Sequence, residues 1–232
     1  MQPTRRTSLI FGLFFAGTFL FSIPALFFYA PVLHDTGYIL GEAFDTRISM
    51  GALFEILLAI CNIATAVVIF RLGRRVSEAV ALGYVASRIV ESVVILAGVI
   101  SLMSVVTLRA SLGPGDDPAA ITMAGRSLVA FHDWTFLLGP QFCSGFGNGI
   151  LLGYLMFRSG LVPRRMALLG IVGGPLAFVG GVLILFDVIQ PLSSAIFAFT
   201  ALEIAWELSI TTYTLLKGFR PSPALQGYIQ AE

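Results

Sequence analysis

The chain is 232 residues long, 57% hydrophobic and only 12% charged, with a formal net charge of +1. Soluble domains carry about 25% charged residues, so this composition excludes an ordinary soluble protein, and the small net charge gives no sign of a nucleic-acid partner. The mean hydropathy of +0.91 and the apolar runs of about 20 or more residues predict a polytopic membrane protein.

Six apolar segments are long enough to cross a bilayer, and we expect them to form one all-α domain over residues 1–232. The predicted spans cover about 9–33, 48–70, 79–108, 127–157, 166–189 and 192–216. A signal peptide is the alternative for the first run, but the run is too long and lacks a small-residue cleavage site. Cys61 and Cys143 both fall inside spans, so no disulfide framework is expected.

The fourth and fifth segments have features of their own. The fourth is too long for a plain crossing, and Pro140 in its middle predicts a bend. Its first stretch contains His132, Asp133 and Trp134, and a tryptophan is typical of the membrane–water interface. The fifth is rich in glycine, which lets neighbouring helices approach closely.

The positions of basic residues predict the orientation. The N-terminus, the turns after spans two and four and the C-terminal tail carry ten Lys and Arg, namely Arg5, Arg6, Arg71, Arg74, Arg75, Arg158, Arg164, Arg165, Lys217 and Arg220. The opposite side carries three, Arg47, Arg109 and Arg126. Basic residues favour the cytoplasm, so both termini should be cytoplasmic and the protein should lie in the cytoplasmic membrane.

Polar residues within the spans are the candidate site. Arg88 and Glu91, three residues apart, share a helix face inside the third span, where unpaired charges are costly. At about 1.5 Å per residue, the polar groups lie about 12 to 22 Å from the cytoplasmic helix ends. We therefore expect a polar pocket between spans two, three, four and six. Its candidate residues are Glu55, Asn62, Tyr84, Arg88, Glu91, Gln141, Asn148, Glu203 and Glu207.

The charge balance of this pocket predicts a function. Four glutamates face one arginine, and surplus acids in a low-dielectric site bind a proton or a cation. The first hypothesis is ligand binding, or transport coupled to protons or cations, with Glu91, Glu203 and Glu207 as the titratable groups. The alternative is that these pairs only fix helix packing in a structural or accessory subunit. The expected partners are membrane lipids and a small-molecule or cation ligand. Assembly into a homo-oligomer is a further alternative.

A second class of function is an intramembrane enzyme that acts on a lipid or isoprenoid. His132 and Asp133 are its acid–base candidates, near the outer surface. His34 is the only other histidine, so a three-histidine zinc centre is excluded and no metal site or cofactor is predicted. No Walker, G-x-G-x-x-G or G-x-S-x-G motif occurs.

Four stretches resemble the domain of unknown function 4386 family. They are Phe54 to Leu57 with Asn62, Leu82 to Glu91, Tyr154 to Arg164, and Leu202-Glu203 with Leu215 to Phe219. The resemblance covers nearly the whole chain and implies a six-span membrane protein of a mainly bacterial family. It implies no activity and provides no catalytic residues, so the site residues above rest on the sequence pattern alone.

Overall fold

The computed structural model describes residues 3–41, 45–191 and 193–222, and this part of the chain contains helices and no strand. The fold is all-α, as predicted. The elements are α1 (Pro3–His34), η1 (Tyr38–Leu40), α2 (Thr46–Gly73), α3 (Glu78–Ser111), α4 (Pro118–Phe136), η2 (Leu137–Cys143), η3 (Gly145–Leu152), α5 (Gly153–Ser159), α6 (Arg164–Leu185) and α7 (Ser194–Leu216).

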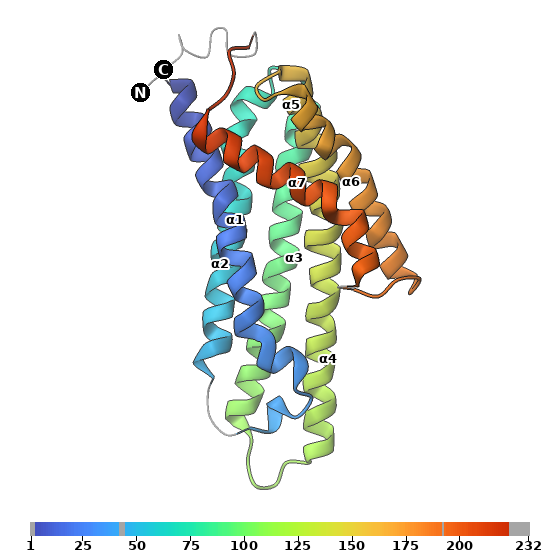
Figure 1. Ribbon diagram of the computed structural model, residues 1–232. Coiled ribbons are helices and arrows are strands. Elements are labelled where there is room, and N and C mark those ends of the chain that lie inside the picture. Colours follow the sequence, from blue (N-terminus) through green and yellow to red (C-terminus); the bar gives the residue numbers. More distant parts are fainter. Residues whose placement is uncertain (1–2, 42–44, 192, 223–232) are drawn as a thin grey trace.

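Five helices are long and apolar enough to cross a membrane: α1, α2, α3, α6 and α7. The predicted fourth span falls on α4, η2, η3 and α5, which follow one another without a loop and form one continuous column (Figure 1). Pro140 lies within η2, which is π-helical, as is η3. The wider winding accommodates a residue that has no N–H to donate.

The bounds of α6 and α7 differ from those of the predicted fifth and sixth spans. The fifth span was expected to reach residue 189, but α6 ends at Leu185. Hydropathy stays high through Phe186 to Ile189, whereas the backbone turns at Asp187, which has a φ of 56°. The predicted start of the sixth span, Leu192, lies outside the described residues, and α7 begins at Ser194 with Ser193 as its N-cap.

The helices differ in length, and this gives the bundle two unequal parts. α6 has 22 residues, about 33 Å at 1.5 Å per residue, which matches a hydrocarbon core of about 30 Å. α3 has 34 residues, about 51 Å. Figure 1 shows the α6–α7 connection near mid-height of the α4 column, so α1 to α4 continue past it. We call this continuation the outer extension.

The opposite end of the bundle, which we call the basic end, joins the first helix to the last. Arg5 Nη1 donates to the carbonyl of Thr214 at 3.0 Å, and Nη2 donates to that of Leu215 at 2.7 Å. These bonds satisfy carbonyls that the end of α7 leaves without helical partners. The start of α1 and the end of α7 therefore lie on the same side (Figure 1).

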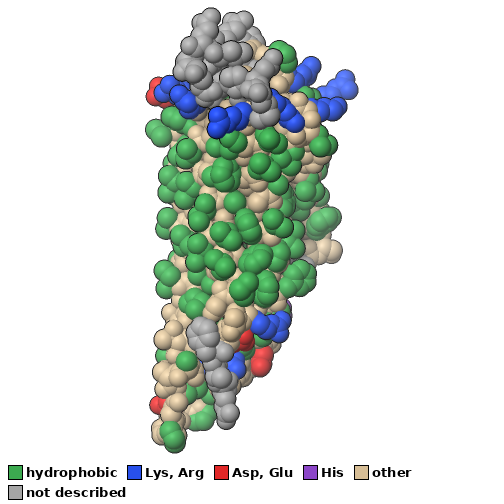
Figure 2. All heavy atoms as spheres, turned by 90° about the vertical axis from the view of Figure 1, so that its left-hand side faces the viewer, with side chains coloured by type: hydrophobic (Ala, Val, Ile, Leu, Met, Phe, Trp, Pro, Cys, Tyr) green, Lys and Arg blue, Asp and Glu red, His purple; other side chains and the backbone are tan. Residues whose placement is uncertain are grey.

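The outer surface and the core follow the membrane pattern. Figure 2 shows an apolar band between two zones of charged side chains, with Lys and Arg gathered at the basic end. Inside, one buried cluster near the basic end includes Phe11, Leu72 and Trp206. A second, around Tyr29 and Leu102, lies toward the outer extension.

The glycines of α6 pack closely, as expected from the sequence. A Cβ on Gly173 would lie 2.6 Å from the backbone nitrogen of Glu203, and one on Gly174 would meet the backbone of Gly145 and Gly149. Only glycine permits these approaches without displacement of a helix. The contacts hold η3, α6 and α7 together around Glu203.

Candidate functional site

The polar residues of the spans form three separate groups. In the first, Arg88 Nη1 lies 2.6 Å from Glu91 Oε2, and Arg88 Nη2 donates to Asn62 Oδ1. Asn62 Nδ2 in turn donates to Glu91 Oε1 at 3.3 Å. This closed triangle joins α2 to α3, and only 2% of Arg88 is exposed. Arg88 and Glu91 therefore neutralise each other.

The second group joins α3, η3 and α7 around Asn148. Tyr84 Oη donates to Asn148 Oδ1 at 3.2 Å, and Asn148 Nδ2 donates to Glu207 Oε1 at 2.6 Å. Ser144 Oγ donates to the same Glu207 oxygen at 2.9 Å. Trp206 Nε1 donates to the Asn148 carbonyl at 2.9 Å. Two donors thus hold the Glu207 carboxylate on one side.

The third group lies nearer the outer extension. Tyr29 Oη donates to Glu55 Oε2 at 3.1 Å, and the Tyr29 ring meets His132 edge-on with centroids 5.6 Å apart. His132 Nδ1 is 3.8 Å from Asp133 Oδ1, beyond hydrogen-bond distance. Glu55 therefore lies with Tyr29 rather than with Arg88, although Glu55 and Asn62 share a helix.

Glu203 belongs to none of these groups. It is only 4% exposed, and neither carboxylate oxygen has a hydrogen-bond partner within the described part of the chain. A Cβ on Gly149 would lie 2.6 Å from Glu203 Oε2, which shows how closely η3 confines the side chain. A buried polar group without a partner is costly, by about 1–3 kcal/mol and more when charged.

Glu203 also lines a cavity of about 820 Å³ between α1, the α4 column, α6 and α7. The polar lining side chains are His132, Asp133, Gln141, Ser144, Ser193, Thr200, Glu203 and Glu207, and the lining residues include no Lys or Arg. The apolar wall includes side chains that are partly exposed, among them Leu26 (42%) and Phe197 (63%). The cavity thus combines acidic groups with apolar walls.

The structure separates the residues that the sequence grouped together. Gln141, Glu203, Glu207, His132 and Asp133 line the cavity, whereas Glu55, Asn62, Tyr84, Arg88, Glu91 and Asn148 do not. The cavity therefore shares spans four and six with the predicted pocket, but α1 and α6 line it in place of spans two and three.

Ser144 and Tyr29 are among the site residues that the sequence pattern did not single out. Ser144 lies three residues after Gln141 and four before Asn148, so it extends the polar stripe that those residues already indicated. Tyr29 gave no such signal, because a single tyrosine in an apolar span is ordinary. Among the described residues, no group of three or more His, Cys, Asp or Glu is placed to hold a metal ion.

Comparison with protein families identifies the chain. The family model "Domain of unknown function (DUF4386)" matches residues 10–218, which is most of the sequence. The chain therefore belongs to the DUF4386 family, as its sequence motifs indicated. Comparisons with curated proteins and with solved structures found no match.

Proposed function

We propose that this DUF4386 protein binds an amphipathic ligand, with a cationic or hydrogen-bond-donating head, in the cavity between α1, the α4 column, α6 and α7. The observation that carries the proposal is Glu203, a buried carboxylate that has no partner within the described residues and lines a cavity of about 820 Å³. Sites of about 300–1,000 Å³ suit ligands of drug-like size.

The chemistry of the lining supports this ligand class. Three carboxylates, Asp133, Glu203 and Glu207, are balanced by no lysine or arginine in the lining. A cationic head would neutralise an acid and give Glu203 a hydrogen-bond donor. The apolar walls would hold a hydrocarbon tail, which could enter from the bilayer beside Leu26 and Phe197. Transport coupled to a proton or cation would use the same acids.

The closed Arg88 triangle has a different role in this proposal. Its charges are paired, and it does not line the cavity. We assign it to helix packing, which was the structural alternative for the whole polar set. Helix packing does not explain why Glu203 is buried, because its carboxylate has no partner within the described residues.

An intramembrane enzyme is the second candidate. His132 and Asp133 line the same cavity as Glu203, so a bound lipid would lie within reach of both side chains. Proton transfer would require His132 Nδ1 and Asp133 Oδ1 to approach from their present 3.8 Å. Turnover of a bound lipid, lost in His132→Ala, would favour this candidate over simple binding.

We also propose that the basic end faces the cytoplasm and that the protein lies in the cytoplasmic membrane. The support is the excess of Lys and Arg at the basic end (Figure 2). The first and last described residues both lie at the basic end (Figure 1). An even number of membrane crossings would place them on the same side.

Ligand binding can be measured by tryptophan fluorescence in lipid nanodiscs. The chain has two tryptophans: Trp134 lines the cavity, and Trp206 is buried beside Asn148. Dodecyltrimethylammonium, dodecyl sulfate and dodecanol serve as cationic, anionic and neutral probes of equal chain length. We expect the cation to change the fluorescence of the wild type but not of Trp134→Phe, which keeps Trp206.

The Glu203→Gln variant decides whether the acid recognises the head group. We expect it to weaken binding of the cation about tenfold, equivalent to about 1.4 kcal/mol, and to leave dodecanol binding unchanged. Glu78→Gln is the matched control, since Glu78 is an exposed acid at the start of α3. Equal affinities for the three probes, or an unaffected Glu203→Gln, would overturn the proposal.

A further inference from the structure

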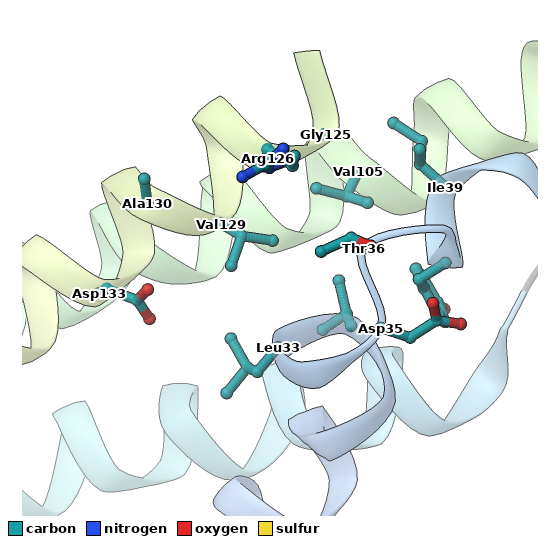
Figure 3. Close-up of a pocket in the computed structure, with 12 residues that line it drawn as sticks. Leu33, Asp35, Thr36, Ile39, Val105, Gly125, Arg126, Val129, Ala130 and Asp133 are labelled. Carbon is teal, nitrogen blue, oxygen red and sulfur yellow. The ribbon is translucent and has the colours of Figure 1, made fainter. Parts of the chain in front are cut away.

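A second, smaller cavity of about 150 Å³ lies in the outer extension, between the end of α1, η1, α3 and α4 (Figure 3). Its charged lining residues are Asp35, Arg126 and Asp133, and Thr36 and Tyr38 add hydroxyl groups. Asp35 and Arg126 are both exposed. This cavity therefore lies where the bundle continues past the α6–α7 connection, on the side opposite the basic end.

The two cavities adjoin each other. Leu33 of α1 and Asp133 of α4 line both of them. Figure 3 places these residues on the two helices that flank the same opening. The Asp133 side chain is 67% exposed, so the junction carries an exposed acid on its α4 side.

Toward the basic end the large cavity meets closely packed side chains. Tyr84, Leu152 and Trp206 are each 0% exposed and belong to one buried cluster. The hydrogen bonds of Asn148 to Tyr84 and Glu207 lie in the same region. The large cavity thus adjoins the small one on the outer-extension side, and closely packed side chains lie toward the basic end.

We propose that the Leu33–Asp133 junction is an aqueous access route, through which water and small cations reach the Glu203 cavity from the outer-extension side. The two aspartates outnumber the one arginine of the small cavity, and an acidic, low-dielectric passage concentrates cations. The inference deepens the proposed function, on which it rests for the role of Glu203. A ligand tail enters from the bilayer, while the charge that meets Glu203 comes from the outer aqueous phase.

Cysteine labelling tests the route without any ligand. In a Cys61→Ala, Cys143→Ala background, Ser144→Cys and Thr200→Cys each place one thiol in the cavity. The probes are membrane-impermeant methanethiosulfonates, one with a trimethylammonium group and one with a sulfonate, added to either side of sealed vesicles. We expect labelling from the outer-extension side only, with the cationic reagent about tenfold faster.

Control thiols separate the route from general exposure. Val93→Cys lies on the membrane-facing surface, with Val93 60% exposed, and Ile210→Cys lies in the packed cluster near the basic end. We expect neither to react from either side. Asp133→Asn should lower the preference for the cationic reagent while leaving the sulfonate reagent able to reach Ser144→Cys.

A blocking substitution at the junction completes the test. Leu33→Trp should slow labelling of Ser144→Cys at least about tenfold, whereas Leu20→Trp should not, because Leu20 lies on the exposed face of the same helix. Labelling from the basic end, no labelling of either cavity thiol, or an equal rate in Leu33→Trp would overturn the route. The proposed function stands or falls separately, on the effect of Glu203→Gln on cation binding.

Discussion

Glu203 and Glu207 lie one helical turn apart on α7, yet their carboxylates have opposite surroundings. Glu207 Oε1 accepts hydrogen bonds from Asn148 and Ser144, whereas Glu203 accepts none from the described residues. The difference arises because Glu207 faces Asn148 of η3 and Ser144 just before it, while the Glu203 carboxylate lies close to Gly149, which has no side chain to donate. Two acids that look equivalent in the sequence therefore have different costs of burial.

This contrast predicts opposite effects of one substitution. Glu203→Leu should leave the protein as stable as the wild type or more stable, because it removes a buried polar group without a partner. Glu207→Leu should destabilise it by about 1–3 kcal/mol, because the donors of Asn148 and Ser144 lose their acceptor. Reversible unfolding in mixed micelles measures both. A larger loss for Glu203→Leu would mean that its carboxylate has a partner in the membrane.

The Arg88 triangle makes a second stability prediction. Arg88→Ala leaves Glu91 buried without its cation, which should cost about 3–5 kcal/mol. Arg74→Ala is the control, since Arg74 is exposed at the basic end. The double variant Arg88→Met, Glu91→Leu should recover most of the loss, because no charge is then left buried alone. Equal folding yields for Arg88→Ala and Arg74→Ala would contradict this assignment.

The orientation can be read from two reporters. A reporter fused after Glu232 should be cytoplasmic, and one inserted between Gly113 and Pro118, in the α3–α4 connection, should be external. The expectation follows from the basic end and from six crossings. If both reporters lie on the same side, the number of crossings is wrong.

Tyr38, in the outer extension, should make the stability of the protein depend on pH. Burial raises the pKa of Tyr38 to about 12, from an ordinary value of 10.0, and its hydrogen bond to Asp45 acts in the same direction. The folded protein therefore binds the phenolic proton more tightly than the unfolded chain does, so this stabilisation is complete below pH 10 and declines as the pH rises toward 12.

Absorbance at 295 nm and thermal unfolding across that pH range should show both effects. The absorbance of the wild type minus that of Tyr38→Phe should show the phenolate of Tyr38 forming near pH 12. The unfolding temperature of Tyr38→Phe should fall less than that of the wild type between pH 10 and 12. A difference spectrum that titrates near pH 10 would place Tyr38 in water.

The sequence predicts the helices of this protein better than it predicts which helices meet. Apolar run length specifies the spans, and the Arg88–Glu91 spacing places both groups on one face. Glu55 illustrates the limit: its partner Tyr29 comes from α1, and hydropathy contains no information about which helix lies beside which. The same limit applies to the cavity, which α1 and α6 line in place of spans two and three. The glycines of α6 indicate that other helices can approach it closely, but they do not indicate that these are η3 and α7.

The last prediction concerns the glycine that holds α6 against Glu203. Gly173→Ala places a methyl group 2.6 Å from the backbone nitrogen of Glu203, where no flexible side chain can yield, so α6 and α7 must separate. We expect a loss of about 1–3 kcal/mol and weaker binding of a cationic amphiphile, because Glu203 moves with α7. Gly83→Ala is the matched control, since its methyl group would meet only the Leu151 side chain at 3.4 Å. Unfolding and dodecyltrimethylammonium titrations of the two variants measure both effects. Wild-type stability of Gly173→Ala would show that α6 and α7 are not packed as closely as the structure indicates.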